Sequence, residues 1–489
     1  MRIHFAAAEL APLVQSGGLG DAVTGLALAL AERGHTLTCV VPAYRRALAS
    51  PGCPPLTPAG EMRIALPDGE LEGRWLEGWL APGVRLRLLD LPELYDRPGL
   101  YGEQGLDYPD NPLRYIALAR AAAYLCEADP PDVLVAHDWH AALAVATLRT
   151  VFPQGASRRV ATVQVVHNNA YQGRCPPELY ALTGLPPGLY HPDGVEAWGT
   201  LCLLKAGIMF ADRIVAVSPG YAREIQRAPA GEGLEGAYTF LAHRLSGISN
   251  GIDTKRFDPA TDAALPATFS AEKTEGKASC RAALLAELGL ARTPPGRLCV
   301  AIGRFAQQKG WDVLAEAVDA LVAGGATLAL LGSGDAAIAA NIGAAAARHP
   351  RRVALRTGFD DGLARRLYAA ADAVLIPSRF EPCGLVQMIA QRYGALPVAH
   401  RVGGLSDSIA EPRHLAEGLD WSEASGVLFS PLSVETLVSA TAAVATLADV
   451  GGLPALQRRL LGLDVSWRVP AMRWELLLQS AARDALERP

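Results

Sequence analysis

Two basic residues stand five positions apart in one short loop, Gly303-Arg304-Phe305-Ala306-Gln307-Gln308-Lys309-Gly310, between an apolar run and a helix-like segment. Arginine offers a planar fork of N–H donors and lysine a compact charge, so Arg304 and Lys309 can converge on a pyrophosphate. Such a contact would stabilise a nucleotide leaving group as its bond to a sugar breaks. The alternative is a solvated basic loop. Only five of the 45 basic residues are lysines, and the lysine retained here favours phosphate binding.

A single acid occupies a second loop of the same kind, Pro377-Ser378-Arg379-Phe380-Glu381-Pro382-Cys383-Gly384-Leu385. Pro382 suits the first position of a helix, and the amides of Cys383, Gly384 and Leu385 would then face an anion. Near a helix N-terminus Glu381 should stay ionised, ready to accept sugar hydroxyls or to face positive charge at an anomeric carbon. The alternative is that Glu381 only caps the helix.

Near the start of the chain, three glycines fall within Gln15-Ser16-Gly17-Gly18-Leu19-Gly20-Asp21, between an apolar run (3–8) and a helix-like segment (22–33). Without side chains, the backbone amides of this corner can approach a ligand closely. A helix N-terminus there suits a phosphate or the polar edge of a sugar. The alternative is a strand-to-helix turn that binds nothing.

Polar clusters also follow two apolar runs in the first half of the chain. His137-Asp138-Trp139-His140 comes after residues 133–136, and His167-Asn168-Asn169 after residues 163–166. Ligands of open parallel sheets bind at the carboxyl ends of the strands, so His167 and Asp138 are candidates to hold the sugar or its acceptor, with a purely structural histidine as the alternative. His137 and His140 do not indicate a metal site, because they lack a nearby third ligand and the helical i, i+4 spacing.

The elements that must position these residues alternate between strand and helix patterns. We predict two doubly wound α/β domains, each with its own parallel sheet and with a cleft between them. The stretch 43–82, rich in Pro and Gly, is expected to be irregular. Residues 258–297 are the candidate boundary region, and a helix is expected over 472–486. Strands are expected at 3–8, 37–41, 133–136, 163–166, 213–217, 298–302, 327–331, 353–356, 373–376 and 397–399.

Composition limits the classes of function. The chain has 489 residues, half of them hydrophobic, which is ample for large buried cores. Its net charge of -5 gives no case for a nucleic-acid partner. Eight scattered cysteines without a Cys-x-x-Cys pair fit a reduced compartment. The N-terminus does not read as a signal peptide and no apolar run reaches spanning length, so a soluble, cytoplasmic protein without a membrane partner is expected.

Taken together, these segments resemble bacterial glycogen synthases and plant starch synthases, and the resemblance runs almost from end to end. This family consists of retaining glucosyltransferases of the GT-B type, with two Rossmann-like domains facing each other across a deep cleft. The shared motifs are Gly17-Gly18-Leu19-Gly20-Asp21, Tyr95-Asp96-Arg97, Tyr108-Pro109-Asp110-Asn111, His137-Asp138-Trp139, His167-Asn168, Tyr171-Gln172-Gly173, Leu204-Lys205-Ala206-Gly207, Asn250-Gly251-Ile252-Asp253, Gly303-Arg304, Gln308-Lys309-Gly310, Glu381-Pro382-Cys383-Gly384-Leu385 and Ser466-Trp467.

The resemblance implies an activity and an organisation. The activity is transfer of glucose from ADP-glucose to the non-reducing 4-hydroxyl of an α-1,4-glucan such as glycogen, with retention and with neither metal nor cofactor. The N-terminal domain would span 1–250 and be joined by the last helix, 466–489. The nucleotide-sugar domain would span 251–465.

The resemblance also implies roles for single residues. Those assigned to catalysis are Glu381, His167, Arg304, Lys309 and Asp138. Arg304 and Lys309 would bind the diphosphate, while Glu381 and His167 grip the donor glucose. Further donor contacts would come from Gln15, Gly17, Gly18, Gly20, Asn250, Cys383, Gly384 and Leu385. The acceptor side would include Tyr95, Asp138 and Trp139.

One position departs from the family pattern. The family usually has a lysine where this chain has Gln15, and loss of one charged contact to a donor phosphate corresponds to about 1.5–3 kcal/mol. This departure motivates the alternative of a related glucosyltransferase with another donor, such as UDP-glucose, or another acceptor. Two further alternatives are a paralogue that binds glucan or nucleotide without turnover, and a hydrolase that pairs Asp138 with Glu381.

Overall fold

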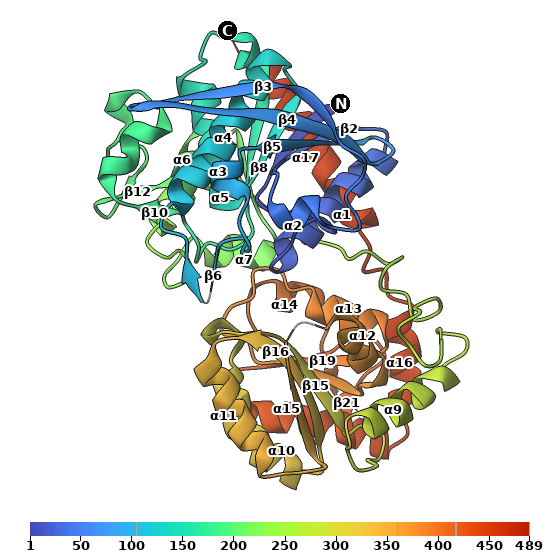
Figure 1. Ribbon diagram of the computed structural model, residues 1–489. Coiled ribbons are helices and arrows are strands. Elements are labelled where there is room, and N and C mark those ends of the chain that lie inside the picture. Colours follow the sequence, from blue (N-terminus) through green and yellow to red (C-terminus); the bar gives the residue numbers. More distant parts are fainter. Residues whose placement is uncertain (104, 359, 416–417, 489) are drawn as a thin grey trace. The chain divides into compact units, whose positions relative to one another are not determined.

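The computed structural model describes residues 1–103, 105–358, 360–415 and 418–488. The chain divides into two compact units, of which unit 1 comprises Met1–Gly251 with Trp467–Pro489 and unit 2 comprises Ile252–Ser466. Each unit has a largely parallel sheet flanked by helices (Figure 1). The predicted fold class, two α/β domains with parallel sheets, is confirmed.

Unit 1 is organised around a nine-stranded sheet in the order β14-β13-β9-β8-β1-β2-β5-β4-β3. The strands from β14 to β5 are parallel, whereas β4 and β3 are antiparallel. The central strands are buried because helices cover the sheet. The strands are β1 (Arg2–Ala6), β2 (Thr36–Pro42), β3 (Thr57–Leu66), β4 (Gly69–Ala81), β5 (Val84–Asp90), β8 (Val133–His137), β9 (Ala161–Val166), β13 (Arg213–Ala216) and β14 (Leu245–Gly247); shorter ones are β6 (Gly102–Glu103), β7 (Leu106–Asp107), β10 (Arg174–Cys175), β11 (Glu196–Ala197) and β12 (Thr200–Cys202).

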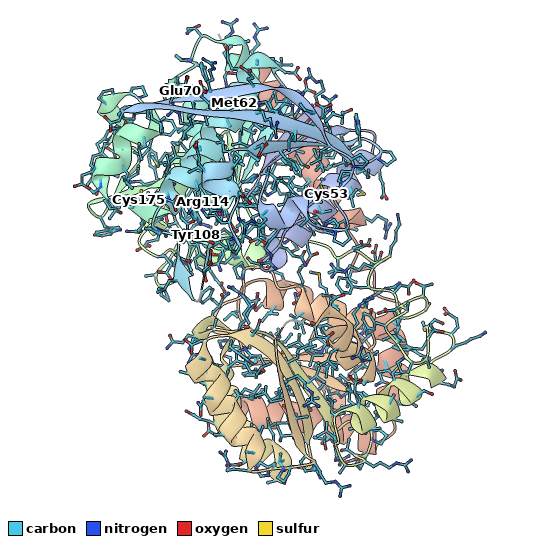
Figure 2. All side chains as sticks on the ribbon, in the orientation of Figure 1. Cys53, Met62, Glu70, Tyr108, Arg114 and Cys175 are labelled. Atoms are coloured by element: carbon cyan, nitrogen blue, oxygen red, sulfur yellow. The ribbon has the colours of Figure 1, made fainter. Side chains whose placement is uncertain are left out.

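The prediction that residues 43–82 are irregular is wrong. Strands β3 and β4 form a long hairpin, and β4 pairs in turn with β5. Inward-facing Met62, Ile64 and Trp75 are buried, while residues between them, such as Glu70, are exposed (Figure 2). One face of this hairpin is exposed to solvent and carries charged residues, so the sequence contains no continuous apolar run that would indicate a strand.

The helices of unit 1 include one from the end of the chain. Helix α17 (Arg468–Leu486) packs against α1 and β9, more than 300 residues away in sequence (Figure 1). Helix α1 begins at Gly18, four residues before the predicted start. The remaining helices are α1 (Gly18–Glu32), α2 (Arg45–Leu48), α3 (Pro92–Tyr95), α4 (Asn111–Ala128), α5 (Asp138–Thr150), α6 (Leu203–Phe210), α7 (Pro219–Glu224) and α8 (Glu235–Phe240), with 3-10 turns η1 (Ala156–Arg159), η2 (Pro177–Thr183), η3 (Pro187–Leu189) and η4 (Ala242–Arg244).

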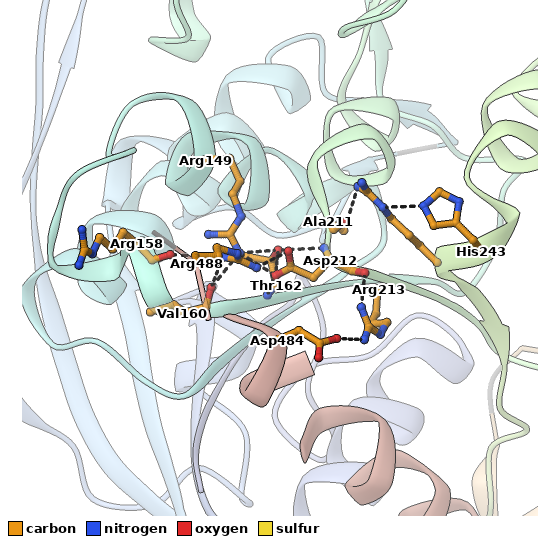
Figure 3. A network of polar contacts seen from close by, with 11 residues as sticks. Arg149, Arg158, Val160, Thr162, Ala211, Asp212, Arg213, His243, Asp484 and Arg488 are labelled. Carbon is orange, nitrogen blue, oxygen red and sulfur yellow. Dashed lines mark hydrogen bonds and ion pairs between the residues drawn. The ribbon is translucent and has the colours of Figure 1, made fainter. Parts of the chain in front are cut away.

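Ion pairs hold the end of α17 to unit 1. Asp212 accepts hydrogen bonds from Arg149 at 2.7 Å and from the C-terminal Arg488 (Figure 3). Arg213 of β13 pairs with Asp484 of α17 (Figure 3). Asp212 thus bridges two arginines in a largely buried place and ties the end of the described chain to the middle of unit 1.

Unit 2 has a six-stranded parallel sheet in the order β17-β16-β15-β18-β19-β22. Its core includes Leu314 of α10, Ile342 of α11 and Leu437 of α15. The strands are β15 (Leu298–Phe305), β16 (Thr327–Gly334), β17 (Val353–Thr357), β18 (Ala373–Ile376), β19 (Leu396–His400), β20 (Arg413–Leu415), β21 (Gly418–Asp420) and β22 (Val427–Phe429); the helices are α9 (Glu275–Glu287), η5 (Gln307–Lys309), α10 (Trp311–Ala323), α11 (Ala336–Ala347), α12 (Asp361–Ala370), α13 (Val386–Arg392), α14 (Gly403–Ser408), α15 (Val434–Asp449) and α16 (Leu453–Leu461).

In the part of the chain that the structure describes, no single helix has both the length and the apolarity of a membrane span. The consecutive helices α15 and α16 reach these values only as a pair, bent by 106°.

Candidate active site

The basic loop of unit 2 (306–310) follows β15 (Leu298–Phe305), so Gly303, Arg304 and Phe305 belong to the end of that strand and not to the predicted loop. Arg304 is exposed and forms no ion pair with any residue that the structure describes. Lys309 lies one turn further on, in η5. Gly310 then adopts φ +67°, and a Cβ atom there would lie 1.9 Å from the carbonyl oxygen of Pro377. Only glycine therefore lets the basic loop lie directly against the loop that carries Glu381.

This packing brings Lys309 and Glu381 into contact. The Nζ of Lys309 lies 2.6 Å from Oε2 of Glu381, and the hydroxyl of Ser378 donates to the same oxygen at 3.0 Å. Glu381 is only 9% exposed, so these two bonds stabilise its charge. No described residue donates to Oε1, which is left for a ligand. A small pocket at this point is lined by Ile302, Lys309, Trp311, Ile376, Ser378 and Glu381.

The predicted helix start at Pro382 is wrong. Helix α13 begins at Val386, and Gly384 precedes it with φ +76°, outside helical geometry. Cys383, Gly384 and Leu385 therefore form a loop, whose shape is set by the Nε2 atom of Gln387 donating to the carbonyls of Cys383 at 3.0 Å and Gly384 at 2.9 Å. Sequence spacing does not indicate this role for Gln387.

The glycine corner of unit 1 is fixed by an acid that the sequence did not single out. The buried carboxylate of Glu9 accepts bonds from the backbone N–H and the hydroxyl of Ser16, both at 2.7 Å, and from the hydroxyl of Tyr101 at 2.6 Å. Helix α1 starts directly after, with Gly17 as its flanking residue and the amides of Gly18 and Gly20 in its first turn. Glu9 thus orients the corner in which ligand contacts were predicted.

Gln15 lies at the entrance to this corner. A Cβ atom on Gly20 would come within 2.9 Å of the Cβ of Gln15, so glycine allows α1 to pack close to it. The Oε1 atom of Gln15 is buried and accepts no hydrogen bond from any residue that the structure describes. This amide oxygen lacks a donor at the position for which the resemblance implies a lysine.

Asp138 and His167 lie together at the carboxyl ends of β8 and β9. Oδ1 of Asp138 accepts the backbone N–H of His167 at 2.7 Å and that of Asn168 at 3.3 Å. Asp138 itself has φ +56°, a strained value for a residue other than glycine. Burial raises the pKa of Asp138 to about 7 and lowers the pKa of His167 to about 3. Asp138 thus positions His167 through the backbone.

The remaining predicted residues have different surroundings. Trp139 is half-buried and stacks on His140, with ring centroids 4.1 Å apart. Tyr95 is buried, and its hydroxyl donates to the carbonyl of Arg114 at 2.6 Å, so it supports the fold of this region rather than offering a free surface. Asn250 follows β14 and is half-buried. Among the described residues, no three His, Cys, Asp or Glu side chains are grouped so as to hold a metal ion.

The structure thus gathers Arg304, Lys309, Glu381 and 383–385 in unit 2, and Gln15, the glycines, Asp138, Trp139 and His167 in unit 1. Two Rossmann-like units, each with polar residues at the carboxyl ends of its parallel strands, are the architecture of GT-B glycosyltransferases, and the matching families and solved structures place this chain in that class.

Comparison with known proteins identifies the family within this class. Residues 2–239 match the starch synthase catalytic domain family, and residues 296–447 match the family of glycosyl transferases group 1. The chain is 41% identical to a glycogen synthase of Rhodopseudomonas palustris (strain BisB18), over 98% of this chain and 97% of that one. It is also 41% identical to a glycogen synthase of Aromatoleum aromaticum, over 98% of this chain and 96% of that one. The catalytic domain of starch synthase IV from Arabidopsis thaliana, solved with ADP and acarbose, superimposes with a TM-score of 0.87 at 29% identity, covering 99% of each chain. This chain belongs to the glycogen and starch synthase family.

Proposed function

We propose that this protein is a glycogen synthase that transfers glucose from ADP-glucose to the non-reducing 4-hydroxyl of an α-1,4-glucan with retention of configuration. The observation that carries the proposal is the contact between Lys309 and Glu381 in unit 2, which also carries the exposed Arg304 at the end of β15. Family membership supports the transfer reaction. The starch synthase structure bound to ADP and acarbose supports an adenine nucleotide and a glucan-like acceptor.

In the proposed reaction the two basic side chains of unit 2 hold the donor diphosphate. Arg304 is free to form a bidentate contact, and Lys309 can reach a phosphate oxygen while remaining close to Glu381. These two cations neutralise the charge that develops on the departing ADP as the anomeric C–O bond breaks, so the proposal requires no metal.

The carboxylate of Glu381 supplies negative charge next to the sugar. Its free Oε1 accepts a hydroxyl of the donor glucose, while Lys309 and Ser378 fix Oε2. In unit 1, His167 binds a sugar hydroxyl, and Asp138 supports it by holding the backbone of residues 167–168. The glycine corner of the same unit offers the amides of α1 to a phosphate or to the polar edge of a sugar.

A donor screen tests this proposal. The purified protein is incubated with glycogen and either ADP-glucose or UDP-glucose, and the released nucleotide is quantified, with Glu381→Gln as the inactive control. We expect release of ADP that depends on glycogen and is absent from the control. Release of UDP alone would assign the chain to a related transferase with another donor, to which Gln15 would then contribute. Release of neither nucleotide would indicate a binding paralogue, and release of free glucose from glycogen a hydrolase.

A further inference from the structure

Two neighbouring histidines of unit 1 share a hydrogen bond. Nδ1 of His137, at the end of β8, lies 2.9 Å from Nε2 of His167, just after β9. The ring of His137 is 1% exposed and packs edge-on against Phe5, with centroids 4.9 Å apart. His167 is half-buried, and none of the described residues bonds to its Nδ1 atom. Nδ1 is therefore the edge that His167 can present to a ligand.

Both rings are neutral near pH 7. Burial lowers the pKa of His137 well below its ordinary value, and burial lowers that of His167 to about 3. A neutral imidazole carries hydrogen on one nitrogen only, so the bond between the rings contains a single hydrogen. Either His137 donates it to His167, or His167 donates it to His137. The two arrangements give His167 opposite properties at its free edge.

The surroundings of His137 favour the arrangement in which His137 is the donor of this hydrogen bond. Its other nitrogen, Nε2, is buried, and none of the residues described in the structure forms a hydrogen bond with it. If His167 were the donor, this Nε2 would carry a hydrogen and would be a buried N–H group without an acceptor. If His137 is the donor, Nε2 keeps only an unused lone pair. Unpaired buried N–H groups are the rarer of these two defects in folded proteins.

We propose that His137 is a positioning residue that donates Nδ1–H to Nε2 of His167, so that His167 presents Nδ1–H as a hydrogen-bond donor at the site. Asp138 complements this effect, because it fixes the backbone of His167 while His137 fixes the tautomer of the ring. The ligand that accepts this hydrogen bond is a sugar hydroxyl oxygen. Only this last statement rests on the proposed function.

The tautomer can be measured without any substrate. Nuclear magnetic resonance of the intact protein with ¹⁵N-labelled histidine rings distinguishes the protonated nitrogen of each neutral ring from the unprotonated one. Comparison with His167→Asn assigns the His167 signals. We expect His167 to carry its hydrogen on Nδ1 in the wild-type protein. A hydrogen on Nε2 of His167 would overturn the proposal, whichever sugar nucleotide the enzyme uses.

A pair of matched variants tests whether His137 sets the tautomer of His167. His137→Phe removes the donor and keeps an aromatic ring, whereas His140→Phe makes the same change in a buried histidine that forms no hydrogen bond with His167. We expect the Nδ1–H form of His167 to lose population in the first variant and to be retained in the second. A full Nδ1–H population in His137→Phe would refute the role of His137. If that variant fails to fold, the wild-type measurement still decides the proposal.

Activity gives a further readout. With the donor sugar that the screen identifies, His137→Phe should reduce kcat/KM about tenfold, equivalent to one lost hydrogen bond, and His140→Phe by much less. Loss of activity in both variants with an unchanged tautomer would indicate general disruption of the fold and would count against the proposal.

Discussion

Substitutions at the contact between Lys309 and Glu381 should change the free energy of unfolding and the affinity for ADP in different ways. The Nζ–Oε2 distance is 2.6 Å, and the side chains are only 23% and 11% exposed. Lys309→Met leaves the buried carboxylate with the hydroxyl of Ser378 as its one remaining donor. Removal of one partner from such a pair costs about 3 kcal/mol in the free energy of unfolding. Glu381→Gln keeps the shape and leaves Lys309, the more exposed partner, free to reach water, at a cost of about 1 kcal/mol.

The double variant measures the coupling. Because each single variant leaves the other group without its partner, Lys309→Met with Glu381→Gln should be more stable than the sum of the single effects predicts, by about 1–2 kcal/mol. Urea unfolding of the four proteins gives this value. Additive effects would show that the two side chains do not interact in solution.

Nucleotide binding separates their functions. Lys309→Met should weaken ADP binding about tenfold to a hundredfold, since a hydrogen bond to a charged phosphate is lost. Glu381→Gln should bind ADP as well as the wild type or better, because Lys309 is no longer held by a carboxylate. Isothermal titration calorimetry measures both, and Arg348→Met, which breaks an exposed pair with Asp319 elsewhere in unit 2, is the matched control for loss of a positive charge. If Glu381→Gln weakened ADP binding as much as Lys309→Met, the assignment of Lys309 to the diphosphate and Glu381 to the sugar would be refuted.

Three other predictions concern unit 1. Gln15→Lys should raise kcat/KM with ADP-glucose about tenfold, by restoring one charged contact, and an unchanged value in steady-state assays would mean that another group supplies it. Asp212→Asn should lower the free energy of unfolding by about 3–5 kcal/mol, because it leaves Arg149 and Arg488 without their shared carboxylate. The control variant Asp484→Asn changes a carboxylate that is 56% exposed and should lower the free energy of unfolding by less than about 1 kcal/mol. Equal effects of the two variants in urea unfolding would contradict this ranking. Burial raises the pKa of Asp138 to about 7, so its ionised form is disfavoured in the folded protein and the stability present at acid pH is lost as the pH rises through 7. The Tm of Asp138→Asn should therefore rise relative to the Tm of the wild type as the pH is raised from 5 to 8. A Tm difference that stays constant over this range would show that Asp138 titrates normally.

Much of the fold could be predicted because its strands are short apolar runs that end at polar motifs. Glu381 and His167 follow β18 and β9, at the carboxyl edges of the sheets as predicted, whereas Arg304 lies within β15, which runs three residues further than the predicted strand 298–302. The hairpin of β3 and β4 was missed because one of its faces is polar. Pro382 predicts a helix start, but Gly384 has a positive φ and the helix begins only at Val386.

The residues that support the site were not predictable from spacing. Glu9 lies seven positions before Ser16, and nothing in that interval indicates that its carboxylate fixes the glycine corner. Gln387 looks like an ordinary helix residue until the carbonyls of the preceding loop are seen to bond to it. The bond between His137 and His167 joins the ends of two consecutive strands, and the pairing of β8 with β9 indicates their proximity but not which ring atoms meet. Each of these contacts depends on the folded backbone.

The most direct test of the proposed activity is the product itself. The purified protein is given ADP-glucose, ¹³C-labelled at the anomeric carbon, and a short α-1,4-glucan primer, and the new linkage is observed by nuclear magnetic resonance. The proposal predicts an α-configured anomeric signal from glucose attached to the 4-hydroxyl of the primer, appearing in step with ADP. A β-configured linkage, or labelled glucose released into water without extension of the primer, would contradict it.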